Sequence, residues 1–168
     1  MNQTPVKQAH INGSGFLVLG RNRIKGISFT GTATTGFLAL FDTTVAPITT
    51  ATYGRSGTTV TITQSSHGLV TGQVIGIDFA AGTGGTATNG NYAVTVTNSS
   101  TFTITDINSG TITNTPGLVY ANRWLLSYDV TGTDIFNNSP FIPDDGVVAT
   151  DGIYAYLSNV SACNIYYG

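Results

Sequence analysis

Apolar residues recur at every second position in several short stretches of the chain. Within residues 58–105 they are Val60 and Ile62, then Ile75, Ile77 and Phe79, then Tyr92, Val94 and Val96, then Phe102 and Ile104. Thr fills many of the positions between them. A period of two is typical of strands that bury one face and expose the other. The pattern therefore predicts a compact unit of four strands with a threonine-rich outer face.

Similar short patterns continue on both sides of this unit. Strands are predicted at 16–19, 24–29, 37–41, 124–130, 146–149, 152–159 and 162–167. The segment 43–53 contains Pro47 and is interpreted as a connector, and 131–143 is interpreted as a loop. About seven short strands are enough for one antiparallel sandwich of jelly-roll or related Greek-key topology.

These patterns predict an all-β protein with three parts. Residues 1–15 are polar and turn-rich, and are expected to form an N-terminal arm that orders against a neighbour. Residues 16–52 and 116–168 are expected to form a discontinuous, jelly-roll-like antiparallel β-sandwich body. Residues 53–115 are expected to form a small β module inserted into that body.

The composition supports strands over helices and narrows the range of partners. Charged residues make up only 8% of the chain, and all eight acidic residues are Asp. Helix surfaces normally carry Glu, Lys and Arg, so few helices are expected. The net charge of −2 gives no electrostatic basis for binding nucleic acid. A surface so poor in charge is typical of proteins that pack into assemblies, and we expect a homo-oligomer.

The N-terminal residues, the lengths of the apolar runs and the single cysteine argue against an exported, a membrane-spanning or a thiol-reactive protein. The first residues lack the apolar segment of a signal peptide, and no run of residues is long and apolar enough for a membrane span. Neither export nor a membrane partner is therefore expected. Cys163 lies in an apolar stretch and is expected to be a buried, inert thiol.

Candidate catalytic and metal-binding groups are few. Ser66, His67 and Asp78 contain the residue types of a nucleophile, a base and an orienting acid, but no nucleophile-elbow motif surrounds them. We favour a turn role for His67, with its ring bonded to the local backbone. Asp144, Asp145 and Asp151 could offer oxygen ligands to calcium, but an ordinary turn after Pro143 is the preferred interpretation. No enzymatic activity, metal or cofactor is predicted.

Two further groups of residues suggest contacts with partners. Lys7, Arg21, Arg23 and Lys25 concentrate positive charge near the N-terminus. A solvated strand and turn is the preferred interpretation, but this edge could still contact an acidic neighbouring subunit. Tyr and Trp residues could form a carbohydrate platform, but a core or subunit-interface role is commoner. They are Tyr120, Trp124, Tyr128, Tyr154, Tyr156, Tyr166 and Tyr167.

Several motifs resemble those of bacteriophage structural proteins. The pattern at 66–72, then Asn89–Val94, then Ser100–Ile104, is similar to a small β module in tail-fibre and other virion proteins of tailed phages. Gly36–Asp42 and the ending from Phe141 to Gly168 resemble small structural proteins of marine and cyanobacterial phages. The resemblance implies no catalytic residues in this chain.

This resemblance implies a non-enzymatic virion component, most concretely a capsid decoration (cement) protein. Its expected partners are the major capsid protein and further copies of itself, as a homotrimer. It would be made in the host cytoplasm and reside on the capsid surface. The alternative is a receptor- or glycan-binding module of a tail fibre or head fibre, with the inserted module as the adhesin.

Overall fold

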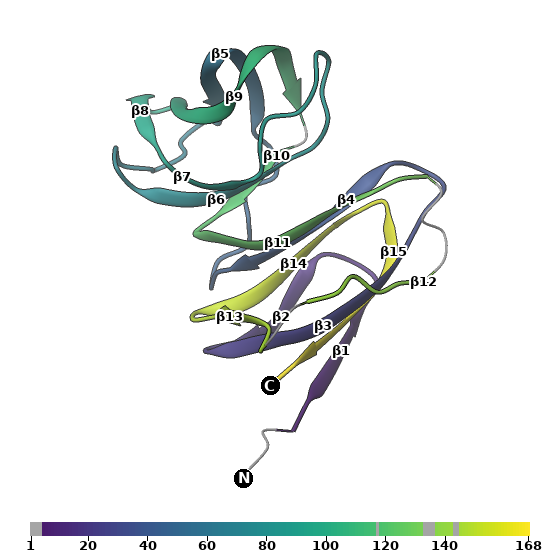
Figure 1. The fold of residues 1–168 in the computed structure, drawn as a ribbon. Helices are drawn as coiled ribbons and strands as arrows, with labels where there is room; N and C mark the ends of the chain where they lie inside the picture. The colour runs from purple at the N-terminus through teal and green to yellow at the C-terminus, as the bar shows by residue number, and fades with distance from the viewer. Residues whose placement is uncertain (1–4, 117, 133–136, 143–144) are drawn as a thin grey trace. The chain divides into compact units, whose positions relative to one another are not determined.

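The computed structural model describes residues 5–116, 118–132, 137–142 and 145–168, and they form an all-β protein. The chain divides into two compact units (Figure 1). Unit 1 is discontinuous and consists of Met1–Ala46 and Leu125–Gly168, whereas unit 2 is Pro47–Trp124. Within the described residues no helix is long and apolar enough to cross a membrane.

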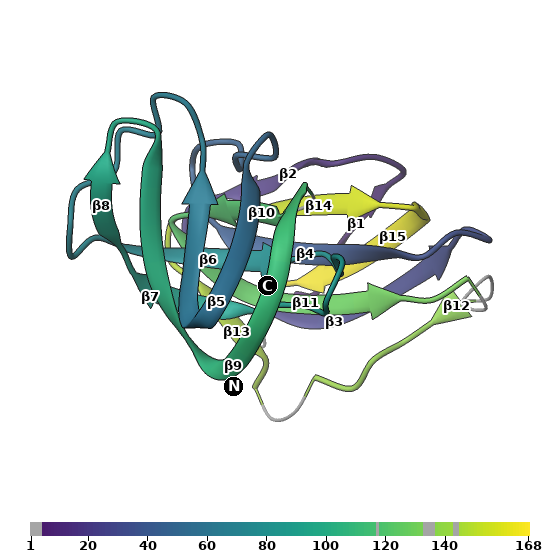
Figure 2. The ribbon, with the colours of Figure 1, turned by 90° about the horizontal axis from the view of Figure 1, so that it is seen from above.

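Unit 1 is a sandwich of two antiparallel sheets. The first contains β1 (Lys7–Ile11), β15 (Val160–Tyr167) and β3 (Asn22–Gly31) in that order, and the free edge of β3 pairs with both β12 (Asn137–Asn138) and β13 (Val147–Ala149). The second sheet has the order β11 (Arg123–Val130), β4 (Gly36–Asp42), β14 (Gly152–Ser158) and β2 (Gly15–Leu19). In Figure 2, β2 and β14 of this sheet run side by side.

The core of unit 1 contains the inward-facing apolar residues of both sheets. Ile24 and Ile27 of β3, Leu38 and Leu40 of β4, and Ile153 of β14 are buried in it. Cys163 is also fully buried in this core, as its apolar surroundings predict. Alternation along the strands therefore decides which side chains face this core, although Phe37, Ala39 and Phe41 at the other positions of β4 are buried as well.

The prediction that residues 1–15 form an arm is wrong for the part that the structure describes. Residues 7–11 form β1, which pairs in register with β15 from Lys7–Tyr167 to Ile11–Cys163. Gln8 and His10 also contact the Asn164 side chain, at 3.0 and 2.9 Å. The segment was missed because its apolar positions are sparse, and it forms the edge strand of a sheet whose other strands supply the core.

Unit 2 is built from two three-stranded antiparallel sheets around its own core. One sheet has the order β5 (Thr52–Thr63), β9 (Thr101–Pro116) and β8 (Thr95–Asn98), and the other has the order β10 (Leu118–Ala121), β6 (Val74–Phe79) and β7 (Gly90–Ala93). Tyr53, Ile62, Phe79 and Phe102 are among the fully buried residues between them. The predicted strand over Tyr92–Val96 divides at Val94, because β7 pairs with β6 whereas β8 pairs with β9.

The threonine-rich outer face of unit 2 follows from the strand register. Thr59 pairs with Thr105, Thr61 with Thr103 and Thr63 with Thr101, while Thr95 pairs with Thr103 from the other side. The inward positions between them carry Val60, Ile62, Phe102 and Ile104, all buried. Thr suits such positions because its branched side chain fits a pleated surface and its hydroxyl is solvated.

The boundaries of unit 2 differ from the predicted 53–115. Ile48 forms a bridge with Tyr120, and β10 pairs with β6, so residues 47–52 and 116–124 belong to unit 2 and not to the body. The Ile48–Tyr120 bridge also brings the entering and leaving chain together. The sequence pattern did not predict these pairings, because Ile48 forms only an isolated bridge and β10 has only four residues.

Candidate functional site

Three of the four predicted partner-contact residues lie close together on the first sheet of unit 1. Arg21 lies in the turn before β3, and Arg23 and Lys25 lie on β3 itself. Lys7 on β1 pairs with Tyr167 of β15, which in turn pairs with Ile24 of β3. Lys7 therefore lies two strands away from Ile24, and their Cα atoms are about 10 Å apart. We call these four residues the basic end of unit 1.

The basic end is held by contacts to main-chain oxygens. Arg23 Nη1 and Lys25 Nζ donate to the carbonyl oxygen of Asp145, at 3.3 and 3.2 Å. The backbones of Arg23 and Gly168 exchange two hydrogen bonds, at 3.2 and 3.0 Å. A carbonyl acceptor orients a cation without neutralising its charge, so these contacts leave the field of Arg23 and Lys25 available to a partner.

A small hollow lies within the basic end. Its volume is about 200 Å³, and it is lined by Arg21, Asn22, Arg23, Val148 and Gly168. Two arginines beside one hollow match the geometry of a carboxylate, which accepts paired N–H donors from a guanidinium. The arrangement suits an acidic side chain from a neighbouring molecule.

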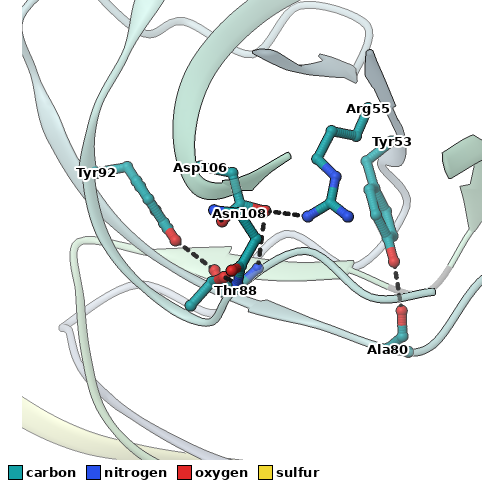
Figure 3. Close-up of polar contacts among 7 residues, drawn as sticks. All are labelled: Tyr53, Arg55, Ala80, Thr88, Tyr92, Asp106 and Asn108. Carbon is teal, nitrogen blue, oxygen red and sulfur yellow. Dashed lines mark hydrogen bonds and ion pairs between the residues drawn. The ribbon is translucent and has the colours of Figure 1, made fainter. Parts of the chain in front are cut away.

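Unit 2 contains a buried ion pair that the sequence analysis missed (Figure 3). Arg55 Nη1 of β5 donates to Asp106 Oδ2 of β9 at 2.6 Å. The same carboxylate accepts from the backbone N–H groups of Thr88 and Asn108, at 3.2 and 3.1 Å. Tyr92 Oη donates to the carbonyl of Thr88, and Asn108 Nδ2 donates to its hydroxyl. The cluster thus ties the loop before β7 to the two longest strands of the unit.

The electrostatics of this cluster indicate a structural role. Burial raises the pKa of Asp106, but hydrogen bonds from Thr88, Asn108 and Arg55 outweigh it and hold the pKa below its ordinary value. The pKa of Tyr92 is raised, by burial and by the negative charge of Asp106. A carboxylate that stays ionised against a buried guanidinium is poorly suited to exchange protons. The cluster stabilises the unit and offers no base for catalysis.

A second buried carboxylate, Asp42, organises the turn between β13 and β14 in unit 1. It is 1% exposed and accepts from Thr150 N, Thr150 Oγ1, Asp151 N and Gly152 N, at 2.8, 2.9, 2.8 and 3.2 Å. Burial raises its pKa, but the hydrogen bonds from these three residues outweigh burial and leave the pKa below its ordinary value. The carboxylate therefore holds the turn in place through these four hydrogen bonds.

The Ser66, His67 and Asp78 candidates do not form a catalytic set. His67 Nδ1 accepts from the backbone N–H of Leu69 at 3.0 Å, so Nε2 carries the proton that it shares with the carbonyl of Asn98 at 2.8 Å. Asp78 is fully buried and accepts from Asn89 Nδ2 at 2.6 Å. Ser66 has a φ of 55°, as in a tight turn. His67 therefore bonds the local backbone, which is the turn role predicted for it.

Of the Asp144, Asp145 and Asp151 candidates, Asp145 and Asp151 lie in the turns on either side of β13. Asp144 falls outside the described residues. Asp145 contributes its carbonyl to the basic end, and Asp151 donates its N–H to Asp42. Among the residues that the structure describes, no group of three His, Cys, Asp or Glu side chains could hold a metal ion.

The aromatic residues occupy several different environments. Tyr120 is buried in the core of unit 2, where its ring meets Phe102 edge-on. Tyr154 and Tyr156 pack against Phe16 and Phe37, with ring centroids 4.8 and 5.3 Å apart. The ring centroids of Tyr128 and Phe29 are 5.8 Å apart, beside a cavity in unit 1. A single platform made of all seven candidates is therefore absent.

No protein-family model, no curated protein and no solved structure matches the chain.

Proposed function

We propose that this chain is a non-enzymatic bacteriophage virion protein, most concretely a capsid decoration (cement) protein. The motif resemblances of the sequence favour a virion component. The strand order of unit 1 supports the proposal further. With β12 and β13 counted as one interrupted strand, unit 1 has eight strands, which can be numbered 1 to 8 along the chain. In that numbering their order is 1-8-3-6 in one sheet and 2-7-4-5 in the other. This interleaving is typical of a jelly roll, a fold common among capsid proteins.

The observation that carries the choice of a decoration protein is the basic end. Four of the six Lys and Arg residues of the chain belong to it. Two of them, Arg21 and Arg23, line a hollow of about 200 Å³ that suits a carboxylate side chain. A protein with so few charges and most of its cations on one sheet is suited to dock on an acidic surface, such as that of neighbouring capsid subunits.

The oligomeric form proposed is a homotrimer on the capsid surface. Its support is the low charge of the chain together with apolar side chains left in water, including Phe16 and Leu19 at the β2 edge. Edge strands such as β1 and β2 offer unpaired backbone groups to a neighbouring copy. Most homo-oligomers have closed symmetry, and a threefold ring is one of its forms.

The deciding experiment measures the number of copies per virion. Particles of the phage that encodes the chain would be purified and the protein quantified against the major capsid protein by mass spectrometry. Hundreds of copies per particle support a decoration protein, and a handful supports a tail or head fibre. Absence of the protein from purified particles would contradict both proposals.

A charge-reversal variant tests the basic end. Arg21→Glu with Arg23→Glu should abolish binding to particles lacking the protein, since each arginine would now repel an acidic partner. Arg123→Glu reverses a charge of the same type outside the basic end and is the control. Equal binding by both variants would exclude the basic end as the attachment surface.

The alternative function, a receptor- or glycan-binding module of a fibre, has one specific observation in its favour. Unit 2 has a hydrophobic core of its own and a threonine-rich outer face. Hydroxyl groups of this kind can hydrogen-bond a polar ligand. In that case particles without the protein should remain robust to heat but fail to adsorb to host cells.

A further inference from the structure

Two Asn-Gly dipeptides occur in the chain, Asn12–Gly13 and Asn89–Gly90, and the fold places them in opposite environments. An Asn before a Gly is prone to lose its side-chain amide spontaneously, because the Gly has no Cβ to hinder the approach of its backbone nitrogen to the Asn side chain. The reaction also needs a side chain that can turn and a backbone that can bend. The structure therefore determines which of the two dipeptides can react.

The first dipeptide lies in the bend between β1 and β2 and is open to solvent. Asn12 and Gly13 are both exposed. Within the described part of the chain, no hydrogen bond joins the Asn12 side chain or the Gly13 N–H to another residue. No atom lies within 4 Å of the position that a Cβ would take on Gly13. Asn12 and Gly13 are thus free to adopt the geometry of ring closure.

The chain is fixed immediately before and after these two residues. Ile11 pairs with Cys163 at the end of β1, and Ser14 Oγ accepts from the backbone N–H of Leu157 at 2.9 Å. β1 and β2 are edge strands of different sheets, so residues 12–13 cross from one sheet to the other. A change in charge or in chain length here therefore arises where both sheet edges meet.

The second dipeptide is held in place within unit 2. Asn89 Nδ2 donates to Asp78 Oδ1 at 2.6 Å, and Asn89 Oδ1 accepts from the backbone N–H of Phe79 at 2.8 Å. Gly90 is the first residue of β7 and pairs with Ile77 of β6. Ring closure would have to turn the Asn89 side chain away from both partners. It therefore requires local opening of this sheet, which costs free energy.

We propose that Asn12 is a site of spontaneous deamidation, and that the fold protects Asn89 from the same reaction. The Gly13 nitrogen forms a bond to Cγ of Asn12, and the bond from Cγ to Nδ2 breaks. Ammonia leaves with the proton that the Gly13 nitrogen loses, and a cyclic succinimide remains. Water then opens the succinimide at either carbonyl, which leaves aspartate or isoaspartate at position 12.

Both products change the junction of β1 and β2. Each adds one negative charge to a chain whose net charge is −2. Isoaspartate also carries the main chain through the former side chain, which lengthens the crossing by one carbon atom. The new charge lies at the ends of two edge strands, where charge opposes pairing with a further strand. The inference goes beyond the proposed function, because the reaction needs no partner.

The test follows both dipeptides in the full chain, in warm, mildly alkaline buffer with and without urea. Peptide mapping by mass spectrometry measures the conversion of each amide to the acid, and enzymatic methylation detects isoaspartate. In the folded chain we expect Asn12 to convert at least roughly tenfold faster than Asn89, because only Asn89 must wait for local opening. In urea the two rates should become similar, since both sites are then Asn-Gly in an unfolded chain.

Two matched variants test the role of Gly13. Gly13→Ala meets no neighbouring atom and no left-handed backbone, so the fold is retained while the new Cβ hinders the attacking nitrogen. It should slow conversion of Asn12 roughly tenfold. Gly15→Ala is equally unhindered, does not follow an Asn and should leave the rate unchanged.

Three results would overturn the proposal. The first is a folded chain in which Asn12 keeps its amide or converts no faster than Asn89. The second is a rate difference that persists in urea, because local sequence and not the fold would then be its source. The third is a Gly13→Ala variant that reacts as fast as the wild type.

Discussion

At the residue scale, the buried charges of this protein continue apolar strand patterns. Leu38, Leu40 and Asp42 occupy successive inward positions of β4, and Phe102, Ile104 and Asp106 do the same on β9. A charge that falls in phase with an apolar run predicts burial, and a buried charge needs partners. The positions of Asp42 and Asp106 were therefore readable from the sequence. Their partners were not, because Thr150 and Arg55 are distant along the chain.

Asp42→Asn should destabilise unit 1 by about 3 kcal/mol, because the amide turns a donor toward backbone N–H groups that then lack an acceptor. The folded pKa of Asp42 lies below its ordinary value of 3.8. The stability that it contributes is therefore fully present above about pH 4 and is lost as the pH falls through the folded pKa. Urea unfolding between pH 7 and pH 3 should show a smaller acid-induced loss for the variant. An unchanged acid dependence would exclude Asp42 as its source.

At the element scale, the sequence predicted most of the strands that build the cores. The predicted strands at 24–29, 37–41 and 124–130 correspond to β3, β4 and β11, each with strong apolar content. The errors lie at β1, β10 and β12, which are edge or short strands. Such strands are defined by backbone pairing to a neighbour, and pairing to a partner 39 or more residues away leaves little trace in local alternation.

Deleting residues 1–13 should destabilise unit 1, because it removes β1 and leaves the edge of β15 unpaired. We expect a loss of about 2 kcal/mol and a fall in Tm of roughly 5 °C, seen by circular dichroism. Lys7→Ala keeps the strand while removing its charge, and is the matched control. A deletion variant as stable as the wild type would mean that β1 contributes no net stability, and that residues 1–13 can be removed without cost to the body.

At the scale of the whole molecule, each unit carries its own reporter. Trp124, the single tryptophan, is the last residue of unit 2, where Asn91 hydrogen-bonds its backbone, and it also lies on β11, which continues into unit 1. Cys163, the single cysteine, lies in the core of unit 1. Burial raises the pKa of Cys163 to about 12, so the thiol reacts only when unit 1 opens. Tryptophan fluorescence therefore follows the end of unit 2, where Trp124 bonds Asn91, and thiol labelling follows the core of unit 1 in the same sample.

Asp106→Ala should lower the urea midpoint of the tryptophan signal and leave that of thiol labelling nearly unchanged. Without Asp106, Arg55 is a buried charge lacking its partner, and its Nε has no hydrogen-bond acceptor among the described residues. The expected cost is about 3–5 kcal/mol. Arg55→Met with Asp106→Leu should cost much less, because no charge then remains buried. Asp42→Asn should show the reverse selectivity, lowering the thiol midpoint alone. If either variant moved both midpoints equally, the two units would unfold as one cooperative body, and the separate cores would not represent separate stabilities.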